Sequence, residues 1–191
     1  MICAVVKLKG ENIRMRCEIV RAGPSQRALL RQLFELYAHE FSAWNVEEVD
    51  GEGRFTPDDF LVDGWGRRGG VGRYLLRVDG QWAGFAFVER GSYVAPGKAM
   101  NWLMDEFFIL MRYRRLGLGR RFALGLFERL PGVWEMGQIP QNRDATAFWR
   151  EVLAGVGGGG YEEFLVENDA WHGPVQVVRV EGIRPAVGVL N

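Results

Sequence analysis

The sequence is poor in side chains that bind metals or form cross-links. Its 191 residues include two cysteines and two histidines. No CxxC spacing occurs, so the pattern supports neither a disulfide scaffold nor a zinc site, and we expect reduced thiols. Lys plus Arg equals Asp plus Glu at 24 each, so the net charge argues against bulk nucleic-acid or membrane binding.

Long hydrophobic runs are also lacking. No stretch reaches the roughly 18 apolar residues of a membrane span, and the apolar run 2–6 is too short for a signal-peptide core. We therefore expect a soluble, cytoplasmic protein. The length suits one domain. Met15 could be an alternative start, so we expect an N-terminal extension over 1–14, the functional domain over 15–181 and a C-terminal tail over 182–191.

Hydrophobic periodicity and turn signals predict a mixed α/β (α+β) domain with one central sheet. The Asp79-Gly80 pair between apolar runs is typical of a hairpin turn. Thr56-Pro57-Asp58-Asp59 has the features of a helix start. Strands are expected at 16–20, 74–78, 82–89, 103–111, 133–139, 161–166 and 175–181, and helices at 26–44, 56–64, 118–130 and 143–153.

A glycine loop from Arg114 to Gly119 fits the pattern [Q/R]-x-x-G-x-[G/A]. A second match begins at Arg67, so the pattern alone is weak, but only the Arg114 copy follows a buried strand and opens a helix. There, unpaired backbone N–H groups carry the positive end of the helix dipole, and glycine lets the chain wrap closely around a pyrophosphate. The alternative is a plain strand-to-helix turn with solvated arginines (Arg114, Arg115, Arg120 and Arg121).

Two other nucleotide motifs do not fit this loop. A dinucleotide fingerprint needs Gly or Ala where Phe122 stands, and the Gly-Lys-Ser/Thr of a P-loop is absent. A mononucleotide- or phosphate-binding α/β protein with a chance motif stays open.

The chain resembles the GNAT superfamily of N-acetyltransferases over two blocks. The first runs from Asp105 through Arg114-x-x-Gly117-x-Gly119. The second is Asn142-x-x-Ala145-x-x-Phe148-Trp149, similar to the family's N-x-x-A-x-x-[F/L]-Y. Together they cover about residues 103–155.

This resemblance implies a GNAT-like fold and acetyl-CoA as the donor, with no metal. The fold would be a mostly antiparallel sheet of six to seven strands flanked by about four helices. Its fourth and fifth strands, here 103–111 and 133–139, would splay apart. The diphosphate would lie on the amides of 115–120, beside Arg114, and the pantetheine arm along Ile109, Leu110 and Met111. The residues implied in cofactor binding are Ile109, Leu110, Met111, Arg114, Arg115, Leu116, Gly117, Leu118, Gly119, Arg120, Asn142 and Trp149.

Two of those residues have ordinary structural roles as alternatives. Asn142 would contact the pantetheine or fix the splayed strand, and it is also placed to cap a helix, which is compatible with the first role. Trp149 stands where many family members carry Tyr as general acid. An indole does not ionise in this range, so Trp149 either packs on the cofactor or belongs to the core, and the proton donor is unassigned.

The catalytic candidates are Glu106, Asp105 and Glu135. Side chains alternate along a strand, so only one of the adjacent acids Asp105 and Glu106 should face a given site. This position is acidic in the spermidine/spermine N-acetyltransferases that the stretch resembles. We take Glu106 as general base, with Asp105 attracting a cationic amine; the alternative is a buried acid paired with an arginine. Glu135, on the neighbouring strand, is the reserve base.

The sequence therefore predicts an acetyl-CoA-dependent N-acetyltransferase acting on a primary amine of a small molecule or protein. A non-catalytic acyl-CoA sensor of the same fold is the alternative that the missing Tyr permits. Tyr37, Trp44 and Trp65 either line an acceptor pocket or belong to the core. Homodimers are common among such enzymes, and the sequence decides neither the oligomeric state nor the acceptor.

Overall fold

The computed structural model describes residues 2–8, 11–45, 48–55, 72–156 and 160–181. Eight strands form one sheet in the order β1-β2-β3-β4-β5-β6-β8-β7. All neighbouring pairs are antiparallel except β5–β6. The strands are β1 Ile2–Leu8, β2 Glu11–Arg21, β3 Gly72–Val78, β4 Gln81–Gly91, β5 Asn101–Ile109, β6 Gly132–Gly137, β7 Tyr161–Asn168 and β8 Trp171–Val180. The predicted mixed, mostly antiparallel sheet is confirmed.

The sheet begins earlier than the sequence analysis expects. β1 pairs with the first half of β2 as a hairpin, so the boundary placed at residue 15 falls inside β2. The reason lies in the period-two pattern, since Ile13, Met15, Cys17 and Ile19 alternate along one strand.

Cys17 is disulfide-bonded, which contradicts the expectation of reduced thiols.

The turn between β3 and β4 has the predicted geometry. Asp79 and Gly80 adopt φ values of 48° and 81°, both in the left-handed region that a two-residue hairpin turn of type I′ requires. The Asp79 carboxylate also accepts a hydrogen bond from the Arg16 amide at 2.8 Å. This bond ties the turn to β2.

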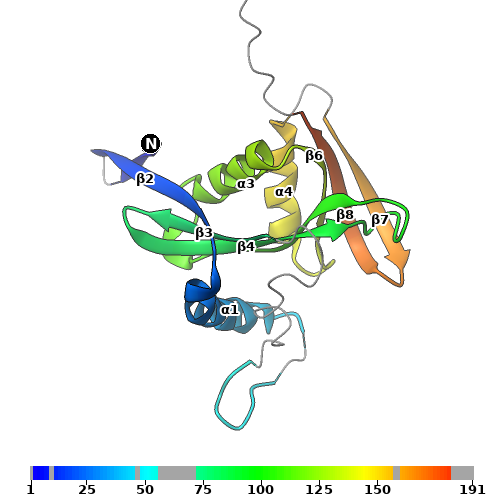
Figure 1. Cartoon of the computed structure of the whole chain (residues 1–191), viewed down its shortest axis with the longest axis horizontal. Coiled ribbons are helices and arrows are strands. Elements are labelled where there is room, and N and C mark those ends of the chain that lie inside the picture. The colour runs from blue at the N-terminus through cyan, green and yellow to red at the C-terminus, as the bar shows by residue number, and fades with distance from the viewer. Residues whose placement is uncertain (1, 9–10, 46–47, 56–71, 157–159, 182–191) are drawn as a thin grey trace, which may run out of the picture.

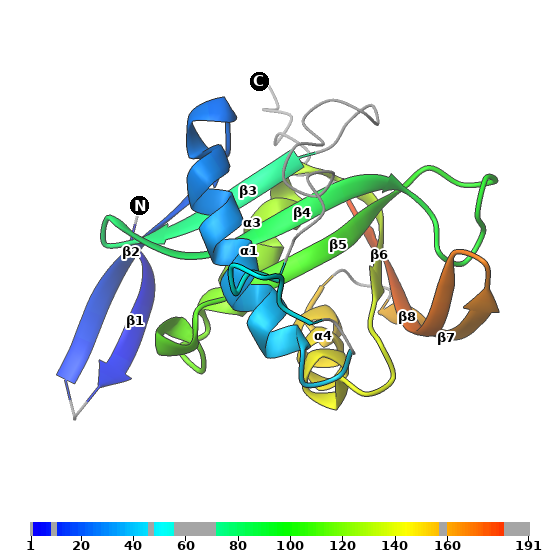
Figure 2. The same cartoon turned by 90° about the horizontal axis from the view of Figure 1, so that it is seen from below.

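Three α-helices lie in the part of the chain that the structure describes: α1 Arg27–Phe41, α3 Leu118–Arg129 and α4 Arg143–Ala154. Two short 3-10 turns, η1 Pro24–Gln26 and η2 Met111–Tyr113, precede α1 and α3. α1 crosses one face of the sheet, whereas α3 and α4 cover the other (Figures 1 and 2). The helix expected to start at Thr56 lies outside the described residues.

Two hydrophobic cores follow from the alternation of side chains along the strands. The core under α1 takes Leu75, Phe85, Phe87 and Phe108 from the sheet. The core under α3 and α4 takes the intervening residues Leu76, Ala86, Val88 and Ile109. Both faces of β3, β4 and β5 are therefore buried. These strands form a rigid support for the residues at their ends.

Candidate active site

The parallel strands β5 and β6 separate soon after they meet. Their register holds only two pairs, Trp102 with Trp134 and Leu103 with Glu135. β5 continues to Ile109, while β6 pairs along its other edge with β8 over its whole length. Within the described chain, the backbone of β5 beyond Leu103 therefore has no strand partner on the β6 side. The two strands form the V-shaped splay that the sequence analysis expects.

The loop at the end of the splay presents a row of unpaired amides. Arg115 and Gly117 adopt φ values of 60° and 71°, and Gly117 is the residue that precedes α3. Across the residues that the structure describes, the amides of 115–120 make no hydrogen bond to backbone or side chain. Unpaired N–H groups at a helix start carry partial positive charge. This row, which we call the amide loop, suits an anionic ligand such as a diphosphate.

Close packing holds the amide loop against the sheet. The Leu118 side chain is fully buried in the core under α3 and α4. A Cβ atom at Gly119 would lie 3.4 Å from the Phe148 ring of α4. Glycine at this position therefore lets α3 start close to α4, and the loop is fixed before any ligand arrives.

The arginines of the loop divide into two groups. Arg115, Arg120 and Arg121 are exposed and add positive charge around the amides. Arg114 is half-buried, and its Nε donates to the carbonyl oxygen of Ile109 at 2.6 Å. Its Nη2 donates to both carboxylate oxygens of Glu40 on α1, at 2.9 and 2.7 Å. Part of the Arg114 guanidinium is thus engaged within the protein.

The three residues expected to meet a pantetheine arm, Ile109, Leu110 and Met111, have different surroundings. The Leu110 amide donates to Ala83 of β4 at 2.9 Å. Because polar groups alternate sides along a strand, those of Ile109 face the splay. The Met111 side chain is 73% exposed. Ile109 therefore brings backbone polar groups to the gap, whereas Met111 lies at its outer rim.

Asn142 and Trp149 have structural roles on α4. The Asn142 side chain accepts a hydrogen bond from the Ala145 amide at 3.1 Å, which caps the helix. Trp149 is 5% exposed and belongs to the core under α3 and α4. Its ring packs edge-on against Phe107 at 5.1 Å. The sequence analysis left two alternatives for Trp149, packing on the cofactor or belonging to the core. In the structure its ring lies in the core.

β5 carries a bulge at Asp105. The register with β4 pairs Phe87 with Glu106 and Val88 with Met104, so Asp105 has no residue opposite it. A bulge breaks the strict alternation of side chains and bends the strand locally.

The bulge turns both acids toward the face of α1. Met104 and Phe107 both pack in the core under α3 and α4, although they are three residues apart. In a regular strand, residues at that spacing point to opposite faces. The two residues between them, Asp105 and Glu106, therefore share the other face. The expectation that only one of these acids faces a given site was wrong, because it assumed an unbroken strand.

Solved structures with the same architecture were found. An acetyltransferase of the GNAT family from Staphylococcus aureus Mu50 aligns with a TM-score of 0.59 at 13% identity, over 87% of this chain and all of that one. An acetyltransferase from Thermus thermophilus aligns at 0.60 and 18% identity, over 86% and 97% of the two chains. yncA from Salmonella typhimurium, solved with its cofactor acetyl-CoA, aligns at 0.55 and 13% identity, over 86% and 94%.

The chain has the GNAT fold. Its sequence matches no protein-family model and no curated protein significantly. The likeness is therefore one of fold. The fold class expected from the two sequence blocks is confirmed.

Two tyrosines that come from different parts of the GNAT fold approach the acid pair. The Tyr93 hydroxyl donates to Asp105 Oδ1 at 3.2 Å. Burial is the main reason why the pKa values of Tyr37 and Tyr93 are raised. The negative charge and hydrogen bonding of a nearby acid add to this effect. That acid is Glu106 for Tyr37 and Asp105 for Tyr93. Both phenols therefore stay protonated and serve as hydrogen-bond donors. Sequence reasoning considered Tyr37 but missed Tyr93, which lies in a connection without periodicity.

Glu135 holds the connection between β4 and β5. Its carboxylate is 1% exposed and accepts four hydrogen bonds. The donors are the Ser92 hydroxyl at 2.6 Å, the Tyr93 amide at 2.7 Å, the Val94 amide at 3.2 Å and the Asn101 side chain at 2.7 Å. These bonds give Glu135 a structural role that needs no substrate, and we no longer propose it as a base.

We expect Glu135→Gln to lower the free energy of unfolding by about 2–4 kcal/mol. Hydrogen bonds to charged groups contribute roughly 1.5–3 kcal/mol each, and glutamine would turn an NH₂ group toward donors. Urea denaturation measures the change, with the exposed Glu128→Gln on α3 as a control. A variant that keeps wild-type stability but loses turnover would instead restore Glu135 as a base.

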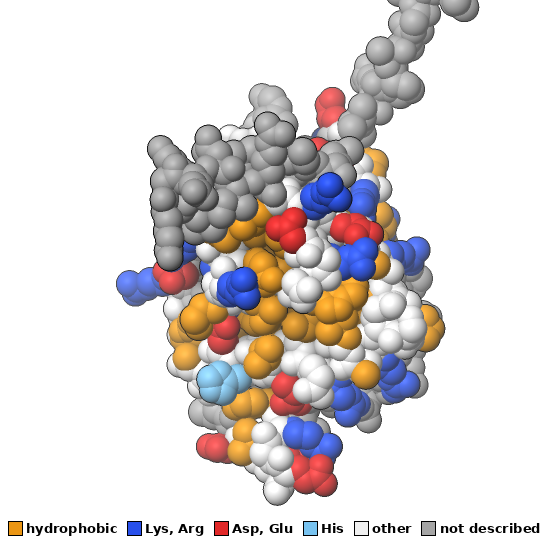
Figure 3. All heavy atoms as spheres, turned by 90° about the vertical axis from the view of Figure 1, so that its left-hand side faces the viewer, with side chains coloured by type: hydrophobic (Ala, Val, Ile, Leu, Met, Phe, Trp, Pro, Cys, Tyr) orange, Lys and Arg blue, Asp and Glu red, His pale blue; other side chains and the backbone are white. Residues whose placement is uncertain are grey.

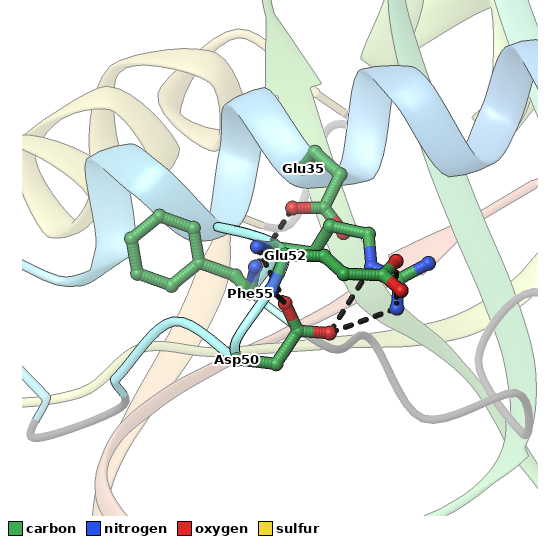
Figure 4. A network of polar contacts seen from close by, with 5 residues as sticks. Glu35, Asp50, Glu52 and Phe55 are labelled. Carbon is green, nitrogen blue, oxygen red and sulfur yellow. Dashed lines mark hydrogen bonds and ion pairs between the residues drawn. The ribbon is translucent and has the colours of Figure 1, made fainter.

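The segment after α1 folds back on that helix (Figure 4). The Glu35 carboxylate accepts a hydrogen bond from the Phe55 amide at 2.9 Å. Asp50 accepts from the amides of Glu52 and Arg54 at 2.8 and 3.0 Å. The Arg54 amide, with a smaller share from the Arg54 side chain, lowers the pKa of Asp50. This turn leads the chain along α1, on the face that carries the acid pair.

The described residues were also compared with the requirements of metal sites and membrane spans. No group of three or more His, Cys, Asp or Glu side chains in the described ranges could hold a metal ion. None of the described helices is long and apolar enough to cross a membrane. Figure 3 shows hydrophobic side chains across the middle of one face, with acidic and basic ones around them. Apolar surface is ordinary in folded proteins, so this face assigns no partner.

Proposed function

We propose that the protein is an acetyl-CoA-dependent N-acetyltransferase that moves an acetyl group to a primary amine. The observation that carries the proposal is the row of unpaired amides at 115–120, placed where β5 and β6 separate. A diphosphate would satisfy those amides, and an extended arm would occupy the splay as an added strand does. The acetyl-CoA-bound relative of the same fold supports this choice of ligand.

Acetyl-CoA would supply an activated acyl group as a thioester. The amide loop would hold the diphosphate, with Arg115 and Arg120 neutralising its charge. The backbone N–H of Ile109, facing the splay, would donate to the oxygen on which negative charge develops. These contacts use main-chain groups that the fold holds in place, so little rearrangement is needed.

We assign the proton chemistry to the bulge. An amine attacks a thioester only in its neutral form, so a base must take its proton, and Glu106 is the candidate. Asp105 would attract the cationic form of the acceptor. As the C–N bond forms and the C–S bond breaks, the thiolate can leave unaided or take a proton from water, since thiol pKa values lie near 8–9. No side chain is therefore required in the role usually filled by Tyr.

A second candidate function is a non-catalytic acyl-CoA-binding module. The buried position of Trp149 favours it, because the residue that often protonates the thiolate is replaced by part of the core. The amide loop and the splay would then serve binding alone. Turnover separates the two candidates.

Calorimetry with CoA and with ATP tests the proposed ligand, and thiol release from acetyl-CoA with a panel of primary amines tests the chemistry. We expect CoA to bind and to raise the thermal midpoint by mass action, with ATP binding more weakly. Binding of CoA with no thiol release for any amine would favour the sensor. Binding of ATP in preference to CoA would overturn both candidates.

A further inference from the structure

The Arg114 side chain connects three parts of the molecule that are far apart in sequence. It contacts the Ile109 carbonyl at the end of β5 and both Glu40 carboxylate oxygens near the end of α1. Its own backbone directly precedes the amide loop, and its amide donates to the Met111 carbonyl in η2 at 3.2 Å. Glu40 and Arg114 are 74 residues apart. This pair is the contact we call the α1 tether.

The α1 tether lies at the mouth of the splay. The Ile109 carbonyl that Arg114 binds faces the gap, because the neighbouring Leu110 amide faces β4. The Arg114 guanidinium lies 5.5 Å from the centre of the Phe108 ring, which packs in the core under α1. The guanidinium therefore sits on the α1 side of the strand end, directly before the amides of 115–120.

The same helix also reaches the acid pair. Tyr37 and Glu40 are three residues apart on α1, a spacing that puts them on one face of a helix. Tyr37 hydrogen-bonds with Glu106 at the bulge, and Glu40 holds Arg114 at the strand end. α1 is thus a rigid spacer between the proposed acceptor side and the proposed donor side.

The α1 tether contributes little to overall stability. The side chains of Arg114 and Glu40 are 36% and 31% exposed, and ion pairs at such exposure contribute only small amounts. Its geometry, however, is specific, because two nitrogens of one guanidinium reach a carbonyl and a carboxylate together. An arrangement of this kind fixes a position more than it stabilises a fold.

We propose that Glu40 is a positioning residue for acyl-CoA binding: it holds Arg114, and Arg114 holds the amide loop at the end of β5. This inference rests on the proposed function. It differs from the expectation that Arg114 binds the diphosphate directly, since in the α1 tether the guanidinium is directed to protein groups. Removing the Glu40 charge should then weaken CoA binding although Glu40 itself contacts no ligand.

A double-mutant cycle tests the α1 tether with CoA as the probe. Kd for CoA is measured by calorimetry at fixed ionic strength for the wild type, Glu40→Gln, Arg114→Gln and the double variant. Glu128→Gln controls for the loss of an exposed acid, and Arg112→Gln removes a positive charge two residues from Arg114. We expect each single variant of the tether to raise Kd about tenfold, and the double variant to be no weaker than Arg114→Gln.

An unchanged or lower Kd for CoA in Glu40→Gln would overturn the proposal. If Arg114 bound phosphate directly, removing a competing carboxylate would leave CoA affinity unchanged or raise it. Effects that add in the double variant would also overturn the tether, because they would show independent actions. The thermal midpoint of Glu40→Gln, expected within a few degrees of wild type, shows that the fold is intact.

Hydrogen exchange separates failure of the tether from failure of the proposed function. In the ligand-free protein, the amides of Tyr113 and Arg114 donate to Leu110 and Met111 within η2. Both should exchange faster in Glu40→Gln than in Glu128→Gln. A wild-type protein that binds no CoA would contradict the proposed function. Unchanged amide exchange in Glu40→Gln would contradict the role of the α1 tether.

Discussion

Replacing Glu106 by glutamine is expected to slow acetyl transfer by about 10²–10⁴-fold, the range typical of a lost general base. Glutamine keeps the size of the side chain and an oxygen that Tyr37 can bind. It cannot accept the proton of the attacking amine at neutral pH. CoA affinity should change little, because the bulge lies away from the amide loop. Thiol release at saturating acetyl-CoA measures the effect, using the best amine of the panel.

The pH dependence of turnover gives this prediction a second readout. A base acts only when deprotonated, so the wild-type rate should rise with pH through the pKa of the group. Burial and the neighbouring acids raise the pKa of Tyr37, so that phenol stays protonated and cannot account for an acidic limb. The limb should be missing in Glu106→Gln. Equal turnover and an identical pH profile in both proteins would reject Glu106 as the base.

Gly117→Val is expected to raise the Kd for CoA by at least tenfold while the protein still folds. Gly117 has φ 71°, and a Cβ there would meet no atom within 4 Å. The cost is therefore conformational: roughly 1–2 kcal/mol to hold an L-residue in the left-handed region, and more for a β-branched one. The chain can relieve this strain only by turning the amides of 115–120 away from their common direction.

Gly97→Val is a matched control for this variant. Gly97 also has φ 71° and open space around its Cβ position, but it lies in the connection between β4 and β5. Both variants should lose similar stability in urea denaturation, and only Gly117→Val should lose CoA affinity. If the two bind CoA equally well, the amide loop does not hold the diphosphate.

Local sequence signals were sufficient for several elements of this fold. The Asp79-Gly80 turn, the helices beginning near Arg27, Leu118 and Arg143, and the alternating strands were predictable because neighbouring residues decide them. The amide loop belongs to the same class, since glycine at 117 and 119 between a buried strand and a helix defines a local backbone conformation. β1 lies within residues 1–14, which the sequence analysis assigned to an N-terminal extension, and its place in the sheet depends on pairing with β2.

Contacts between distant residues decided the rest of the site. The pattern of residues 103–111 does not show that Asp105 bulges, because a bulge is defined by the register with β4. It also does not show that Glu135 receives three hydrogen bonds from the connection between β4 and β5, some 40 residues earlier, and a fourth from Asn101 at the start of β5. Tyr93 belongs to the site because the fold brings that connection beside Asp105.

The amino-acid sequence by itself determined the periodic elements, the turn at 79–80 and the glycine loop, because each depends on the conformational preferences of residues close together in the chain. The tertiary structure alone decided that Asp105 and Glu106 share one face, that Glu135 is a structural acceptor and that Glu40 holds Arg114. Those three results depend on which strand lies beside which and on contacts between side chains that are distant in sequence, 43 residues apart for Ser92 and Glu135 and 74 for Glu40 and Arg114. Local preference carries no information about such contacts until the sheet has formed.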